Sequence, residues 1–92
     1  MGTLSYDIYY SEHALKEFEN LDNSIRHRIK KAIEKLRQFP NVSNIKRLKY
    51  TGHEDYRLKI GDYRIIFRVN EEKKEIYILA LGHRKDIYDL LE

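Results

Sequence analysis

The sequence contains no cysteine, no tryptophan and a single proline among its 92 residues. Without cysteine, the chain forms neither a disulfide framework nor a thiolate metal site, and it has no thiol nucleophile. No apolar run approaches the roughly 20 residues that span a bilayer, and the N-terminus lacks the apolar stretch of a signal peptide. We therefore expect a cytoplasmic protein that does not enter a membrane.

The length and composition allow one small domain over residues 1–92. Hydrophobic residues make up 41% of the chain, which is enough for one modest core. Eighteen Lys and Arg stand against 15 Asp and Glu, for a net charge of +3. Because this excess is small, the distribution of the cations matters more than their number.

The first half of the chain predicts a strand followed by two helices. The stretch LSYDIYY alternates in polarity as a strand does, and Ser11 is a good N-cap for the helix after it. Asp22 or Asn23 can cap the second helix, which ends near Pro40. Its apolar residues recur at helical spacing, at Ile25, Ile29, Ala32, Ile33 and Leu36. The segment 41–54 is expected to be a loop.

The stretch YRLKIGDYRIIFRV, residues 56–69, predicts a β-hairpin around the type II′ turn Gly61-Asp62. Counting outward from the turn places Leu58 opposite Ile65 on an apolar side and Lys59 opposite Arg64 on a basic side. Like charges in opposed positions weaken a sheet. An anionic ligand explains their presence, and a solvated basic face is the alternative.

These elements predict an α+β domain of order β-α-α-β-β-β with a short tail. An antiparallel sheet carries the helical hairpin on its apolar face. The last strand, EIYILALG, is apolar on both sides, which is typical of a central or doubly covered strand. The basic side of the sheet is expected to remain open and concave.

The end of the last strand supplies further candidates for chemistry in LGHRKDIY. If this strand pairs with the hairpin, His83 and Arg84 approach the hairpin cations, and Tyr88 follows one helical turn later. Such a group suits RNA cleavage without metal, in which a 2′-hydroxyl attacks the neighbouring phosphate and fixed cations stabilise the developing charge. Lysine and histidine can release a proton whereas arginine does not, so Lys59 and His83 are candidate bases.

Each of these residues also has a plainer interpretation. His83 can be a turn residue, and Tyr88 can pack the tail onto the domain. The histidines are scattered, and the chain has neither metal-ligand spacing nor a glycine-rich phosphate loop. We expect no metal and no small-molecule cofactor.

The hairpin stretch followed by LALGHRKDIY resembles the RelE/ParE superfamily of toxins from toxin–antitoxin pairs, and the RelE branch most closely. SEHALKEFENLD is similar to the first helix of that family. The resemblance implies a RelE-like fold and a ribosome-dependent mRNA endonuclease that cuts codons in the A site by the metal-free route. It places the site at Arg57, Lys59, Arg64, Arg84 and Tyr88.

One departure concerns the base, because Arg57 stands where some members have lysine, which leaves Lys59 or His83. The resemblance also implies a RelB-like antitoxin that covers the tail and the basic face. A ParE-like gyrase poison without nuclease activity is the alternative function.

Further cations lie outside this group and suit the phosphates of ribosomal RNA, which attract charge without sequence readout. A solvated helix face is the plainer interpretation. The candidates are Lys30 and Lys31 on the second helix, and Lys46, Arg47 and Lys49 in the loop after it.

Overall fold

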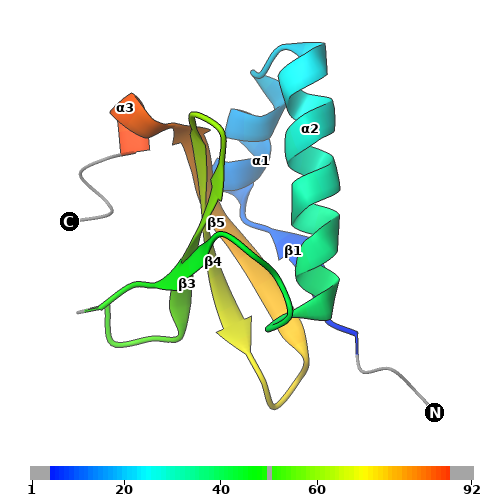
Figure 1. The fold of residues 1–92 in the computed structure, drawn as a ribbon, viewed down its shortest axis with the longest axis vertical. Coiled ribbons are helices and arrows are strands. Elements are labelled where there is room, and N and C mark those ends of the chain that lie inside the picture. Colours follow the sequence, from blue (N-terminus) through cyan, green and yellow to red (C-terminus); the bar gives the residue numbers. More distant parts are fainter. Residues whose placement is uncertain (1–4, 50, 88–92) are drawn as a thin grey trace.

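A computed structural model of the chain describes residues 5–49 and 51–87 (Figure 1). The elements follow one another as expected, with additions after the second helix. In chain order they are β1 (Asp7–Tyr10), α1 (Glu12–Glu19), α2 (Asn23–Glu34), the 3-10 helix η1 (Lys35–Gln38), β2 (Ile45–Arg47), β3 (Asp55–Ile60), β4 (Tyr63–Asn70), β5 (Glu75–His83) and α3 (Arg84–Ile87).

The five strands form one sheet in the order β1-β5-β4-β3-β2. The α+β class is confirmed, and β5 is a central strand as its apolar sequence predicts. The sheet is mixed and not wholly antiparallel as the sequence predicted, because β1 pairs with β5 in parallel while the other neighbours are antiparallel. The helical hairpin between β1 and the remaining strands provides the long connection that parallel pairing needs.

Strand β2 lies in the segment 41–54, where the sequence predicted only a loop. It is three residues long and pairs with the outer edge of β3. Three residues are too few to show an alternating pattern, so the strand depends on the edge that β3 offers.

The predicted β3–β4 hairpin is confirmed residue by residue, with Leu58 opposite Ile65 and Lys59 opposite Arg64. Gly61 has a φ of +55°, the positive value that the first central position of a II′ turn requires.

The helices begin where capping residues predict. The Ala14 N–H donates to the Ser11 side-chain oxygen at 3.0 Å, which satisfies a free amide in the first turn of α1. The second helix ends at Glu34 and tightens into η1, whose C-cap is the buried Phe39 before Pro40.

The two long helices cover one side of the sheet, here called the helix side (Figure 1). Ile29 and Ile33 of α2 pack there against Leu58, Ile65 and Phe67 of the sheet, and all are nearly fully buried. None of the helices in the described part of the chain is long and apolar enough to cross a membrane.

The opposite side of the sheet, here called the far side, is partly covered, whereas the sequence predicted an open surface. Helix α3 lies on that side (Figure 1), and its Ile87 packs against Ile66 and Ala80 in a small buried cluster. Helix α3 therefore shields part of the sheet beside the basic residues, while Gly61 and Asp62 at the hairpin tip are exposed.

Candidate functional site

Two pairs of cations occupy opposed positions on the far side of the sheet. Lys59 lies opposite Arg64 across β3 and β4, and Lys46 lies opposite Arg57 across β2 and β3. Arg57 and Lys59 share a side of β3 because side chains two residues apart point the same way. We call these four residues the cation array.

The turn of the hairpin holds Arg64 in place. Its Nη1 donates to the carbonyl oxygens of Gly61 at 2.9 Å and of Tyr63 at 3.0 Å. Partial burial, reinforced by the nearby charges of Arg57 and Arg84, lowers the pKa of Arg64 below its ordinary value. The charges of Arg57 and Arg84 thus add to the effect of burial on Arg64.

Arg84 joins this group because the hairpin turn anchors the start of α3. The Arg84 backbone N–H donates to the Asp62 carbonyl at 2.7 Å, and its Nε lies 3.9 Å from Asp62 Oδ1. Both side chains are well exposed, so this ion pair is weak. The structure thus brings together Arg57, Lys59, Arg64 and Arg84, as the sequence predicted.

His83 does not join them. It pairs with Tyr63, whose ring packs against the core on the helix side, and the two rings meet edge to face at 5.5 Å. The Lys85 N–H donates to His83 Nδ1 at 3.1 Å, so that nitrogen acts as an acceptor.

A bulge in β5 explains the position of His83. Ile78 pairs with Phe67 and Ala80 pairs with Ile66, which leaves Leu79 as an extra residue. The extra residue reverses the alternation of side chains beyond it. Regular alternation after Ile78 would have turned His83 to the far side with the cations.

The remaining candidates are dispersed. Lys30 and Lys31 are exposed on α2, and Lys49 is exposed after β2. Arg47 lies on the other side of β2 from Lys46, with its Nη2 3.4 Å from Glu54 Oε1. Tyr88 lies outside the described residues.

Arg68 of β4 has a structural role on the same far side. Arg68 forms two hydrogen bonds with the buried carboxylate of Asp55, at 2.7 and 3.1 Å. This pair sits opposite in the β3–β4 ladder, as the hairpin register predicts. The Asp55 carboxylate neutralises the charge of Arg68, so Arg68 adds no unpaired charge to the cation array.

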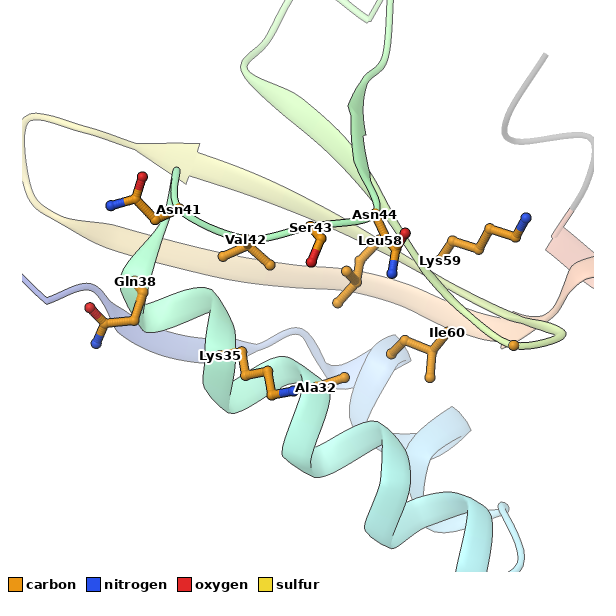
Figure 2. Close-up of a pocket in the computed structure, with 11 residues that line it drawn as sticks. Ala32, Lys35, Gln38, Asn41, Val42, Ser43, Asn44, Leu58, Lys59 and Ile60 are labelled. Carbon is orange, nitrogen blue, oxygen red and sulfur yellow. The ribbon is translucent and has the colours of Figure 1, made fainter.

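A groove of about 430 Å³ lies on the helix side between α2 and the segment that leads into β2 (Figure 2). Its apolar lining includes Ala32, Val42, Leu58 and Ile60. Figure 2 shows the Lys59 side chain extending away from it. Lys59 is nevertheless one of the lining residues, so the groove and the cation array adjoin each other at Lys59.

The array combines groups that bind and stabilise anions. Arginine offers planar donors that match phosphate oxygens, and lysine adds a point charge that can also release a proton. Within residues 5–49 and 51–87, no group of three His, Cys, Asp or Glu residues is arranged to hold a metal ion. The chemistry that these residues themselves support is the binding and polarisation of a phosphodiester.

Comparison with known proteins gives consistent relatives. A family model described as the ParE toxin of the type II toxin–antitoxin system parDE matches residues 8–88. Toxin RelE3 of Methanocaldococcus jannaschii is 32% identical over 85 residues, which are 89% of this chain and 94% of that protein. The mRNA interferase toxin RelE of Escherichia coli K12 is 24% identical over 82 residues, 89% of this chain and 86% of that protein.

The fold has solved counterparts as well. In the crystal structure of the RelB-RelE antitoxin-toxin complex from Methanococcus jannaschii, the similar chain has a TM-score of 0.70 and 30% identity. The match covers 91% of this chain and 99% of that one.

Proposed function

This chain belongs to the RelE/ParE toxin superfamily, on its RelE-like branch, and we propose that it is a type II toxin that acts as an mRNA endonuclease. The cation array, together with Arg84, is the observation that supports this function. A stable sheet has no need of opposed like charges, whereas a scissile phosphodiester needs positive charge around its oxygens.

In the proposed reaction, the 2′-hydroxyl of one nucleotide attacks the adjacent phosphate. The bond from phosphorus to the 2′-oxygen forms as the bond to the 5′-oxygen breaks, which yields a 2′,3′-cyclic phosphate. The departing 5′-oxygen takes up a proton and leaves as a hydroxyl. Negative charge develops on the non-bridging oxygens, where Arg57, Arg64 and Arg84 stabilise it without having to reorganise. Protein cations supply this charge, so the proposed route is independent of metal.

Lys59 is the proposed base that accepts the proton of the 2′-hydroxyl. Arginine does not deprotonate in proteins, and His83 points to the helix side beside Tyr63. Lys59 shares the far side with Arg57 and Arg64 and extends freely from β3. Of the two bases that the sequence suggested, Lys59 is the one on the same side as the proposed phosphate.

The proposed substrate is messenger RNA in the ribosomal A site. The exposed cations Lys30, Lys31, Arg47 and Lys49 lie outside the array and suit contacts with ribosomal RNA phosphates. The proposed partner is a RelB-like antitoxin, as in the antitoxin-toxin complex of the solved relative.

Mapping the 5′ ends of transcripts after brief expression tests this function. We expect new ends within codons for the parent and for Lys73→Gln, a control at the far end of the hairpin β4–β5. Lys59→Gln and Arg64→Gln should produce none. Growth arrest with DNA damage signalling and no codon-linked cuts would instead establish the ParE-like activity.

A further inference from the structure

Arg28 of helix α2 lies against the tip of the β3–β4 hairpin, which carries the proposed catalytic residues. A Cβ added at Gly61 would lie only 3.0 Å from Arg28 Nη2, so the guanidinium rests directly against the turn backbone. Gly61 also has a φ of +55°, which glycine adopts without cost. Glycine therefore serves two purposes at this position: it forms the turn and it leaves space for Arg28.

Two other arginines meet the same turn from different elements. Arg64 of β4 donates to the Gly61 carbonyl, and Arg84 at the start of α3 donates its backbone N–H to the Asp62 carbonyl. Figure 1 shows the β3–β4 turn between α3 on one side and the long helices on the other. Guanidinium groups from α2, β4 and α3 thus surround two turn residues.

The positive charge of the three arginines around the Gly61-Asp62 turn is only weakly compensated. Asp62 is the carboxylate of the turn, its side chain is 66% exposed, and it pairs loosely with Arg84. Arg28 has neither an ion pair nor a side-chain hydrogen bond within the described ranges 5–49 and 51–87. By contrast, Arg26 on the same helix donates to the Glu19 carbonyl and to Asn23.

We propose that Arg28, at the turn beside Arg64 and Arg84, provides a second phosphate subsite, which binds a backbone phosphate of the RNA next to the scissile one. This inference rests on the proposed nuclease function and adds a contact from α2. The site adjoins Lys59 and Arg64, so a strand whose scissile phosphate lies on the array carries its neighbouring phosphate past the turn. Guanidinium groups bind phosphate oxygens in a paired geometry that lysine does not reproduce.

The subsite would orient the strand and would not take part in bond making. Arg28 is therefore a positioning residue, and its loss should affect the binding of the substrate more than the chemical step. A carboxylate of an acidic protein partner is the other anion that three arginines can hold, and the experiment separates the two.

The test uses the full chain, ribosomes programmed with a defined message, and the variants Arg28→Gln, Arg28→Lys and Lys73→Gln. The last removes the same unit charge at the opposite end of the sheet. We expect Arg28→Gln to lower kcat/KM about tenfold, mainly through KM, with partial recovery in Arg28→Lys. Each phosphate contact contributes about 0.7 to the salt slope on single strands, so the slope should fall by about that amount. Lys73→Gln should match the parent.

A second measurement locates the phosphate. Each test message carries one uncharged methylphosphonate linkage attached to a 2′-deoxy sugar. Its control message has the same 2′-deoxy sugar with a normal phosphate. At one linkage beside the cut, the methylphosphonate should slow cleavage by the parent about tenfold. Arg28→Gln should cleave that message no more slowly than its control message.

The outcomes distinguish a failure of the Arg28 subsite from a failure of the proposed nuclease function. If the parent cuts messages and Arg28→Gln cuts them equally well at every salt concentration, the subsite is wrong and the nuclease stands. If Arg28→Gln weakens only the binding of an acidic protein partner, the arginines serve that partner and the RNA subsite is again wrong. If the parent cuts no message, the proposed function fails first.

Discussion

Lys59 and Arg64 face each other directly across the β3–β4 ladder, on the side of the sheet away from the long helices. Opposed like charges destabilise a sheet by a few tenths of a kcal/mol. Replacement of one cation should therefore stabilise the fold and impair its function.

The first prediction concerns Lys59→Gln. The variant should gain a few tenths of a kcal/mol in the free energy of unfolding, because the repulsion with Arg64 is removed. It should lose at least 100-fold in the rate of message cleavage, as expected when a general base is removed. Urea unfolding and single-turnover cleavage measure the two effects, with Lys73→Gln as control. A variant that cleaves as well as the parent would remove Lys59 from the mechanism.

The second prediction concerns the ion pair of Asp55 and Arg68. Asp55 is 3% exposed, so Asp55→Ala leaves Arg68 without its partner in a partly buried position. We expect a loss of about 2 kcal/mol in the free energy of unfolding, below the full cost for a wholly buried pair because the Arg68 side chain is 38% exposed.

The exposed pair of Arg37 and Glu34 is the matched control for this measurement. Its Nε–Oε1 distance is 2.8 Å, but both side chains are more than a third exposed. Glu34→Ala should cost less than about 0.5 kcal/mol. Equal losses for the two pairs would show that burial does not decide their contribution.

The third prediction concerns His83→Gln. Because His83 packs against Tyr63 on the helix side, its replacement should leave kcat/KM for message cleavage within about threefold of the parent. The pH–rate profile should keep its shape. Loss of an inflection near neutral pH in this variant alone would identify His83 as a proton carrier and contradict the placement of Lys59 as the base.

The fourth prediction concerns stability at alkaline pH. Burial, with the nearby charge of Glu34, raises the pKa of Tyr10 above its ordinary value of 10.0. Below pH 10 the phenol is protonated in both the folded and the unfolded chain, so the stability is intact. As pH rises through the raised pKa, the unfolded chain ionises more readily and the folded state loses stability.

Tyr10→Phe should therefore retain more of its stability between pH 10 and 11.5 than the parent does, as measured by Tm. The Phe ring keeps the packing against Phe18, whose centroid lies 6.0 Å from that of Tyr10. Tyr9→Phe on the same strand, where the side chain is 46% exposed, is the control. Parallel Tm curves for parent and Tyr10→Phe would contradict the assignment.

Most of the hairpin and much of the site followed from the sequence. The alternation in residues 56–69 and the glycine turn determined every β3–β4 pair, because strands joined by two residues have one register. The same alternation placed Arg57, Lys59 and Arg64 on one side. Helix capping at Ser11 was also local, since the cap and its amide are three residues apart.

Contacts between distant segments decided the rest. Strand β2 exists because β3 offers it an edge, and this pairing brings Lys46 to Arg57. Arg28 reaches the turn because α2 packs over the sheet and Gly61 leaves room for it. Neither contact has a signal in the local sequence.

The sequence by itself determined the hairpin, the helices and the sign of the charge at their tip, because each depends on neighbours within a few residues. Tertiary structure alone decided which side His83 occupies. The bulge at Leu79 depends on the fit of β5 to β4 and to α1, whose Glu17 accepts the Leu81 N–H at 2.8 Å. One extra residue in a strand reverses all side chains after it, and such a fit is set by segments far apart in the chain.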